Sequence, residues 1–188
     1  MDEKSDGRSH LYASLKHMNK IVVGFSRPKG WFEPFSWLIR LVTWAPMSHA
    51  YIKYYDAYVG RWIIYQASGL KVNFIGEAAF DNAEDVIAEF NLSISDATQQ
   101  KLVQGAVDTL GSPYGIWQVV GYLWVFLMRK LGKTVANPLY SASSFFCSEL
   151  TSDDLEEIGL KGLDPSDMSP KDLYNFMLSK GFVPVSGE

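Results

Sequence analysis

The stretch Ser143-Ser144-Phe145-Phe146-Cys147-Ser148-Glu149-Leu150 holds the only cysteine of the chain, and we treat it as the element around which the fold is organised. Two aromatic residues precede Cys147, and the run from Glu149 to Leu160 has the pattern of a helix. A thiol at a helix start lies among free backbone N–H groups and near the positive end of the helix dipole, and both favour the thiolate. We therefore expect a nucleophilic Cys147 with a pKa below its usual value. The alternative is a small buried residue, which is the common role of a lone cysteine.

The composition indicates one globular domain over residues 1–188, with residues 1–18 as a peripheral extension. A single cysteine excludes an intrachain disulfide. One cysteine and three histidines without close spacing argue against a structural zinc site. The net charge of −4 and the lack of a basic run argue against nucleic acid as the main partner.

One segment raises the question of a membrane. Gly115 to Met128 is almost wholly apolar, interrupted by Gln118, but a bilayer span needs about 20 such residues. A buried helix is the favoured interpretation, and contact with a membrane surface or an acyl chain is the alternative. Met1 to Gly7 is polar and mixed in charge, unlike a secretory signal peptide. The sequence predicts neither a signal peptide nor a transmembrane helix, which leaves the cytoplasm or delivery by another route.

Apolar patterns and turn residues predict the main elements of an α+β domain. The strands are expected at Asn19–Phe25, Ser48–Tyr55, Arg61–Ala67, Leu70–Ile75 and Val86–Leu92. Helices are expected at Phe35–Trp44, Asp96–Leu110, Glu149–Leu160 and from a cap at Ser169 to Gly181, with a further short helix around Leu11–His17.

The pairing of the second and third strands decides which side chain lies beside His49. If the loop between them is Asp56 to Val59, His49 falls opposite Gln66, with Cβ atoms about 5 Å apart on one face of the sheet. A two-residue shift would set Ser68 opposite His49, and a one-residue slip would bring Tyr65 to that face. Gln66 is the favoured partner.

A cysteine nucleophile needs a base, and that base needs a third group that holds its ring. His10 and His17 lie in a polar N-terminal stretch and are expected to be solvated, whereas His49 opens a strand and can face a neighbouring helix. Gln66 can orient the imidazole through its carbonyl oxygen, although it stabilises an imidazolium less well than a carboxylate does. A structural histidine and an ordinary polar glutamine are the alternatives.

Three motifs in this order resemble the circularly permuted branch of the NlpC-type papain-like thiol hydrolases, a group that also contains lecithin:retinol acyltransferase. They are Ser48-His49-Ala50-Tyr51-Ile52, Ile64-Tyr65-Gln66-Ala67 and Phe146-Cys147-Ser148-Glu149-Leu150. In the unpermuted enzymes the cysteine helix precedes the histidine strand, and here the order is reversed. Leu110-Gly111-Ser112-Pro113-Tyr114 resembles the tyrosine-bearing turn of the family, and residues 169–174 resemble the segment that closes permuted chains.

The resemblance implies a permuted papain-like α+β fold, in which an antiparallel sheet packs on helices that include the cysteine-bearing one. It implies Cys147 as the nucleophile, His49 as the base and Gln66 as the residue that orients it. It also assigns Tyr114 and Tyr51 to the oxyanion hole or to substrate binding. This chemistry requires neither a metal nor an organic cofactor.

The chain departs from the family at two places. The third catalytic position is often acidic in permuted bacterial members, whereas Gln66 is neutral. The stretch between Tyr114 and Cys147 is long and apolar, where the unpermuted enzymes have a short glycine-containing turn. We expect hydrolysis of an amide bond, in a peptidoglycan stem peptide or another amidated substrate. The alternatives are a lipid ester or amide hydrolase or acyltransferase, favoured by residues 115–128, and an inactive member kept as a binding or structural module.

The apolar segment also has an internal pattern. Trp117, Val120, Trp124 and Leu127 recur at three- and four-residue steps, so a helix would place them on one face. We expect the segment Ile116–Leu127 to be partly buried, with one edge lining a cleft near the cysteine.

Overall fold

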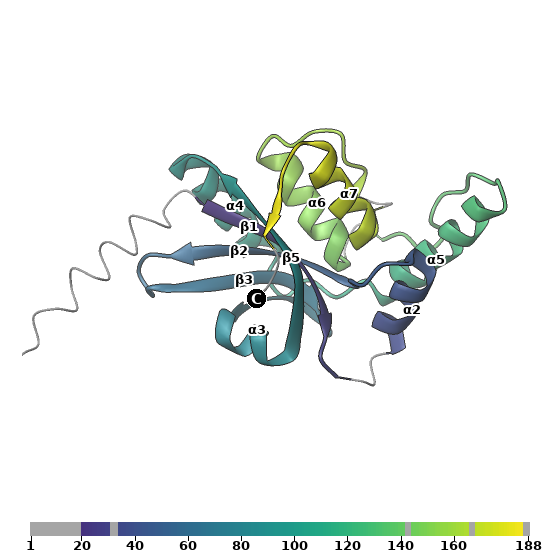
Figure 1. Cartoon of the computed structure of the whole chain (residues 1–188), viewed down its shortest axis with the longest axis horizontal. Helices are drawn as coiled ribbons and strands as arrows, with labels where there is room; N and C mark the ends of the chain where they lie inside the picture. Colours follow the sequence, from purple (N-terminus) through teal and green to yellow (C-terminus); the bar gives the residue numbers. More distant parts are fainter. Residues whose placement is uncertain (1–19, 31–33, 142–143, 166–167, 186–188) are drawn as a thin grey trace, which may run out of the picture.

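The computed structural model describes residues 20–30, 34–141, 144–165 and 168–185, which form an α+β structure around one six-stranded antiparallel sheet (Figure 1). The strands lie in the order β4-β3-β2-β1-β5-β6, and each pair of neighbours is antiparallel. They are β1 (Lys20–Pro28), β2 (His49–Asp56), β3 (Arg61–Ser68), β4 (Lys71–Gly76), β5 (Glu84–Ser93) and β6 (Pro184–Val185). The strand that begins with His49 is therefore an interior strand.

Six helices belong to the described part of the chain. They are α2 (Pro34–Thr43), α3 (Glu77–Ala83), α4 (Asp96–Thr109), α5 (Ile116–Lys130), α6 (Cys147–Glu157) and α7 (Pro170–Ser179). In Figure 1, α6 and α7 lie on one side of the sheet, α3 lies on the other, and α2 and α5 project together beside the body of the domain.

The predicted strands and long helices are confirmed, with small shifts at their ends. β1 continues to Pro28, three residues beyond its predicted end at Phe25. The helix α3 and the two-residue strand β6 were not predicted. His10, His17 and the helix expected around Leu11–His17 lie outside the described residues.

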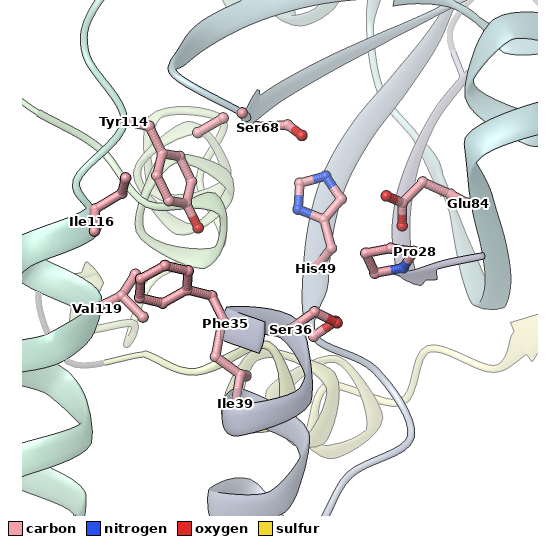
Figure 2. A pocket seen from close by; sticks show the side chains of 13 residues that line it. Pro28, Phe35, Ser36, Ile39, His49, Ser68, Glu84, Tyr114, Ile116 and Val119 are labelled. Atoms are coloured by element: carbon pink, nitrogen blue, oxygen red, sulfur yellow. The ribbon is translucent and has the colours of Figure 1, made fainter. Parts of the chain in front are cut away.

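β2 alternates between the two faces of the sheet, as a strand must. Ala50 and Ile52 belong to the main core on the α6 side, whereas Tyr51 packs on the α3 side with Phe80. His49 follows the parity of Tyr51, and Figure 2 shows its ring projecting from the start of β2. The imidazole is thus set at the first residue of the strand, on the same side as Tyr51.

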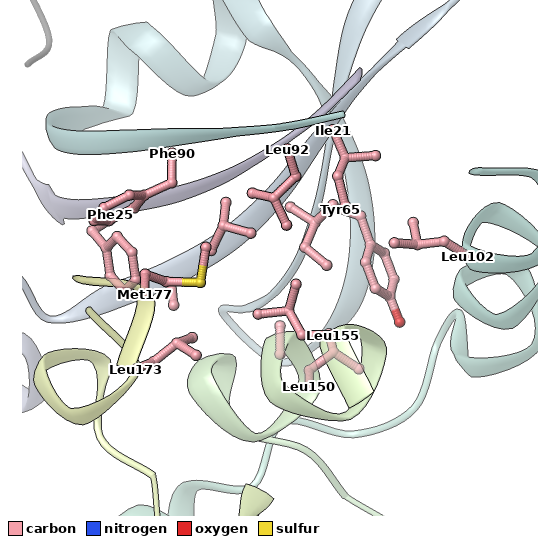
Figure 3. Close-up of a cluster of buried hydrophobic side chains, with 14 of the residues drawn as sticks. Ile21, Phe25, Tyr65, Phe90, Leu92, Leu102, Leu150, Leu155, Leu173 and Met177 are labelled. Atoms are coloured by element: carbon pink, nitrogen blue, oxygen red, sulfur yellow. The ribbon is translucent and has the colours of Figure 1, made fainter. Parts of the chain in front are cut away.

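The main core lies between the sheet and the helices α4, α6 and α7 (Figure 3). Its largest fully buried side chains come from both layers. They include Ile21, Phe25, Tyr65 and Phe90 from the sheet and Leu102, Leu155, Leu173 and Met177 from the helices. This packing fixes α6 against β2 and β3, as the antiparallel-sheet prediction required.

The ends of the helices are set by local sequence. α6 begins at Cys147, two residues before the predicted start, and the N–H of Phe146 donates to the carboxylate of Glu149 over 3.2 Å. α7 has the predicted cap, because the N–H of Asp172 donates to Ser169 Oγ and the Asp172 carboxylate accepts from the N–H of Ser169, both over 3.1 Å. The hydroxyl of Tyr122 also donates to Asp172 over 3.0 Å, which ties α5 to the start of α7.

Gly24 lets one side chain cross a neighbouring strand. It lies opposite Tyr51, and a Cβ at residue 24 would stand 2.0 Å from Cζ of that ring. The ring passes over β1, and its hydroxyl donates to Glu89 on β5 over 2.9 Å. The absence of a side chain at residue 24 therefore permits a hydrogen bond that spans three strands.

Substitution of Gly24 by alanine should destabilise the protein because the new methyl group overlaps the Tyr51 ring. Overpacking of this kind costs about 1–3 kcal/mol, which urea denaturation followed by circular dichroism can measure. Gly76→Ala is the matched control, since a Cβ there meets nothing within 4 Å, and it should change the free energy of unfolding by less than about 0.5 kcal/mol. Equal effects of the two substitutions would contradict this packing.

Candidate active site

Cys147 is the first residue of α6, and only 3% of it is exposed. Its thiol donates to the carbonyl oxygen of Ser48 over 3.9 Å. The backbone N–H groups of Ala50, Ser148 and Cys147 itself act on the same sulfur. Ser48 and Ala50 flank His49, so the thiol rests against the backbone on either side of the residue predicted to be its base.

Tyr114 lies beside the nucleophile, as predicted. Its N–H donates to the carbonyl oxygen of Leu70, and the next N–H, of Gly115, donates to that of Phe145, both over 2.9 Å. The turn is thereby joined to the start of β4 on one side and to the segment before Cys147 on the other. The side chains of Tyr114 and Cys147 are hydrogen bonded, and burial together with the neighbouring thiol raises the pKa of Tyr114 well above its usual value. Its hydroxyl therefore remains a donor.

His49 and Gln66 form a buried pair. Nε2 of His49 and Oε1 of Gln66 are 2.8 Å apart, and both side chains are buried. The predicted partner is found, but the favoured pairing is wrong. β2 and β3 pair Ile52 with Tyr65, a register that, continued along the strands, sets Ser68 level with His49. Gln66 reaches the imidazole diagonally across the two strands.

The loop between β2 and β3 explains this shift. The Asp56 carboxylate accepts from the N–H groups of Tyr58 and Val59 over 2.8 and 3.0 Å. Asp56 thereby remains the last paired residue of β2, opposite Arg61, and the loop is displaced by one residue towards the C-terminus. Side-chain capping of this kind is a common property of aspartate in turns.

A chain of amides fixes the orientation of the Gln66 side chain. Nδ2 of Asn73 donates to the carbonyl oxygens of Ser68 and Lys71 over 3.3 and 3.1 Å, which leaves Oδ1 of Asn73 to accept from Nε2 of Gln66 over 3.4 Å. Oε1 of Gln66 then faces the ring of His49 as an acceptor. Because a carbonyl oxygen only accepts, Nε2 of His49 carries the hydrogen and Nδ1 keeps its lone pair.

Asn73 was missed in the sequence analysis. It is the direct partner of Gln66 in the β3–β4 hairpin, in which Ser68 pairs with Lys71. The two-residue loop that closes this hairpin, with Gly69 at a φ of 68°, is the sequence signal from which this pairing follows.

Burial sets the protonation state of the site. It lowers the pKa of His49 to about 4, against an opposing contribution from the Gln66 hydrogen bond. The imidazole is therefore neutral near pH 7, and a neutral imidazole with a free nitrogen lone pair can accept a proton.

The expected low pKa of the thiol is not found. Burial raises the pKa of Cys147 to about 11. The N–H groups of Ala50, Ser148 and Cys147 lower it without outweighing burial, and the carboxylate of Glu84 raises it further. The resting site thus holds a neutral thiol and a neutral imidazole rather than an ion pair.

His49 opens into a cleft of about 160 Å³ (Figure 2). One wall is apolar and comes from the inner faces of α2 and α5. It consists of Phe35, Ile39, Ile116 and Val119. Ile39, Val119 and Tyr114 also line a much smaller cavity, of about 10 Å³, against Cys147. These three side chains line both the cleft and the small cavity against the thiol, and one edge of the apolar segment lines the cleft, as predicted.

Glu84 is a second residue that the sequence analysis missed. It is the first residue of β5, and it lines the cleft on the side of the His49 ring away from Tyr114 (Figure 2). The hydroxyl of Ser26 donates to its carboxylate over 2.8 Å. The strand predicted from the sequence starts only at Val86, so Glu84 is not predicted to be part of the sheet or to reach this cleft.

Tyr51 does not reach the cleft, contrary to its expected role in the oxyanion hole or in substrate binding. Its ring is fully buried behind His49, with the two ring centroids 6.3 Å apart, and its hydroxyl donates a hydrogen bond to Glu89. The residue supports the imidazole from behind, because it sits on the same face of β2, with the Phe80 ring packed against it at an angle of 57°.

Two further properties of the described residues bear on the site. Within them, no group of three or more histidine, cysteine, aspartate or glutamate side chains is placed to hold a metal ion. No helix among them has both the length and the apolar character needed to cross a membrane.

Comparison with known proteins gives no assignment. Neither the scan against protein-family models nor the search of curated proteins finds a match for this chain.

His49 should make the native protein less stable in acid. The unfolded chain protonates this ring at its usual pKa of 6.5 and the native protein only at about 4. The stability contributed by the neutral ring is therefore complete above pH 6.5 and is lost as the pH falls towards 4. The shift corresponds to about 3 kcal/mol.

Urea denaturation at a series of pH values, on wild type and on His49→Gln, measures this contribution. The carboxylates and the other histidines titrate in both proteins, so the difference between the two curves isolates His49. We expect the wild type to lose more stability than the variant between pH 6.5 and 4. Parallel curves would mean that the imidazole is not buried in its neutral form.

Proposed function

We propose that this protein is a thiol-dependent hydrolase of amide bonds with a permuted papain-like fold. The observation that carries the proposal is the buried pair of His49 and Gln66 on the strands against which Cys147 rests. The motif order supports it, since the family resemblance assigns these residues the roles of base, orienting group and nucleophile. The sheet packed on the cysteine helix is the arrangement that such a fold requires.

The reaction proceeds in two stages. Nδ1 of His49 takes the thiol proton as Sγ of Cys147 attacks the carbonyl carbon, and the carbonyl electron pair moves to the oxygen. The backbone N–H of Cys147 and the hydroxyl of Tyr114 donate to that oxyanion. The imidazolium then protonates the leaving nitrogen as the C–N bond breaks. Water, deprotonated by His49, attacks the thioester, releases the carboxylic acid and restores the thiol.

The neutral resting pair has a consequence for this chemistry. Because the thiol and the imidazole of His49 are both uncharged, proton transfer accompanies the attack rather than preceding it. Gln66 holds the ring without a charge that would stabilise the imidazolium, so the nucleophile should be slower than in sites with an acidic third residue.

The cleft favours a substrate that carries hydrogen-bond donors. The Glu84 carboxylate and the Tyr114 hydroxyl face it from opposite sides, and its volume suits a peptide side chain or backbone segment. A peptidoglycan stem peptide fits this description, because its amide and amino groups would face Glu84. Peptidoglycan stem peptides and similar amidated compounds are therefore the substrate class that we propose.

Two specific observations favour other functions. The outer surfaces of α2 and α5, the helices that wall the cleft, expose large apolar side chains, which favours a lipid ester or amide hydrolase or an acyltransferase. The burial and high pKa of Cys147 favour an inactive module with a binding or structural role.

p-Nitrophenyl acetate tests the nucleophile without knowledge of the natural substrate. Since Cys147 is the only cysteine, intact-mass spectrometry can follow one acetyl group on the chain. We expect the wild type to acquire one acetyl group and Cys147→Ala to acquire none. His49→Gln should react at least about 100-fold more slowly, the usual contribution of a general base.

Tyr58→Phe, in the exposed β2–β3 loop, is the control and should react like the wild type. If the native protein neither keeps an acetyl group nor releases p-nitrophenol faster than Cys147→Ala does, while the urea-unfolded chain reacts, the inactive module is correct. An adduct that persists in Cys147→Ala would show that another residue is the nucleophile. Faster reaction with long-chain p-nitrophenyl esters than with the acetate would favour a lipid substrate.

A further inference from the structure

An apolar groove of about 600 Å³ runs between α2 and α5. We propose that this surface, here called the α2/α5 face, docks on anionic lipid bilayers. We define it by six exposed side chains, Leu41, Trp44, Trp117, Val120, Trp124 and Leu127. The two helices lie side by side beyond the edge of the sheet, so the face is presented clear of the rest of the domain (Figure 1).

The extent of exposure is the first argument. Trp44, Trp117 and Trp124 are 76%, 72% and 49% exposed, and the aliphatic side chains between them are also exposed. Single exposed apolar residues are common on protein surfaces, but all of the defined side chains except Trp117 line one groove, and an apolar patch of this kind marks a contact site.

The inner side of α5 is fully used by the protein itself. Gln118 donates to the carbonyl oxygen of Ser141 over 2.6 Å, and Gly121 makes room for Asn137, whose Oδ1 would lie 1.9 Å from a Cβ at that position. Tyr122 is bonded to α7. The polar and small residues of α5 thus hold it against the domain, and only the apolar outer side is left for a partner.

Charge is the second argument, and it selects the partner. Residues 34–48 and 112–148, which contain both helices, have no aspartate or glutamate and carry four positive charges, from Arg40, Arg129, Lys130 and Lys133. Of these, Lys130 lines the groove itself. The whole chain has a net charge of −4, so the remainder carries −8. An anionic surface would attract the α2/α5 face and repel the rest of the molecule, which fixes one orientation.

Lys130 shows how cationic and apolar groups combine on this face. Its side chain lines the groove, and Nζ lies 5.8 Å from the ring centroid of Trp44 and 5.0 Å from that of Phe126. A lysine that lays its stem along apolar surface and carries its ammonium to the rim suits the boundary between acyl chains and headgroups. Tryptophan is enriched at that same boundary.

Trp44 occupies a backbone position that normally belongs to glycine. It follows α2 with a φ of 52°, and the N–H of Ala45 donates to the carbonyl oxygen of Arg40 over 3.3 Å, the bond that closes this type of helix end. For the helix end alone, glycine would be the more stable residue at this position. A contact outside the chain explains why an exposed indole stands there.

A symmetric pair of these chains fits the face less well than a bilayer does. In a two-fold dimer the same patch meets itself, which brings Lys130 and its neighbouring cations close to their own copies. A bilayer with acidic headgroups offers an apolar layer and an anionic rim together. With 15 residues α5 is shorter than the roughly 20 that span a bilayer, so contact with the membrane surface is the form of docking proposed.

Vesicle co-sedimentation tests the proposal on the full chain. Vesicles of phosphatidylcholine mixed with phosphatidylglycerol should pellet the wild type, and vesicles of phosphatidylcholine alone should bind it more weakly. Added salt should reduce the difference. Trp117→Ser/Trp124→Ser should lower the affinity for the mixed vesicles at least tenfold. Lys130→Gln/Lys133→Gln should lower it by about 30-fold, at the usual contribution of a surface lysine.

Matched variants separate docking from folding. Val59→Ser/Val183→Ser removes two exposed apolar side chains elsewhere, and Lys161→Gln/Lys180→Gln removes two other lysines; both should bind like the wild type. Trp44→Gly should keep the wild-type Tm, because glycine suits that backbone position, and should still bind mixed vesicles more weakly.

The proposal does not rest on the thiol chemistry. Cys147→Ala should bind vesicles as the wild type does, so a failure of the acetylation test leaves docking intact, and the reverse also holds. The proposal is wrong if the wild type stays in the supernatant with the mixed vesicles, or if the Trp117→Ser/Trp124→Ser variant binds equally well. It is also wrong if light scattering shows a dimer that this variant converts to a monomer, since a second copy would then cover the face.

Discussion

The hydrogen bond between His49 and Gln66 is the constraint on which the site depends. A buried imidazole N–H without an acceptor would cost the protein its full desolvation energy, and Oε1 of Gln66 supplies that acceptor over 2.8 Å. Gln66 is held in turn by Asn73, which the β3–β4 hairpin places beside it. Tyr51 packs behind the imidazole of His49, and the Tyr51 ring fits there only because Gly24 has no side chain. The β3–β4 turn, Gly24 and the side-chain amides of Gln66 and Asn73 thus determine the tautomer of His49.

The burial that holds these side chains in place also lowers the reactivity expected of the site. The pKa of Cys147 is raised and that of His49 is lowered, so the charge separation needed for attack has to develop during the reaction. The apolar wall of α2 and α5 is the source of much of this desolvation. Through Ile39 and Val119, which pack with Phe146 just before the nucleophile, the outer apolar surface and the thiol share one structural unit.

The sequence predicted the parts of the fold that depend on local pattern. The strands, the capped helix after Ser169 and the two-sided character of α5 follow from periodicity and from caps. Gln66 was chosen as the partner of His49 from a pairing that proved wrong by two residues. α3 was missed because its seven residues bury a single large side chain, Phe80, and therefore show no helical period. The diagonal contact between His49 and Gln66 depends on how Asp56 caps the β2–β3 loop.

The error in the thiol pKa has a different origin. The helix N-terminus at Cys147 can be recognised in the sequence, but the burial that outweighs it comes from Tyr114, Ile39 and Val119, which lie far away along the chain. Glu84 and Asn73 were missed for the same reason, because only the sheet pairing brings them to the site. Local electrostatics can be predicted from sequence, whereas desolvation requires the tertiary structure.

The most direct test of the account is the tautomer of His49, read by long-range ¹H–¹⁵N correlation NMR on uniformly ¹⁵N-labelled protein. The spectrum of His49→Gln identifies its signals among those of the three histidines. At pH 7 the account predicts a neutral ring with its hydrogen on Nε2, and it predicts that Asn73→Ala and Gln66→Ala give mixed tautomers. A hydrogen on Nδ1, or an imidazolium at neutral pH, would contradict the claim that His49 is held as a base for Cys147.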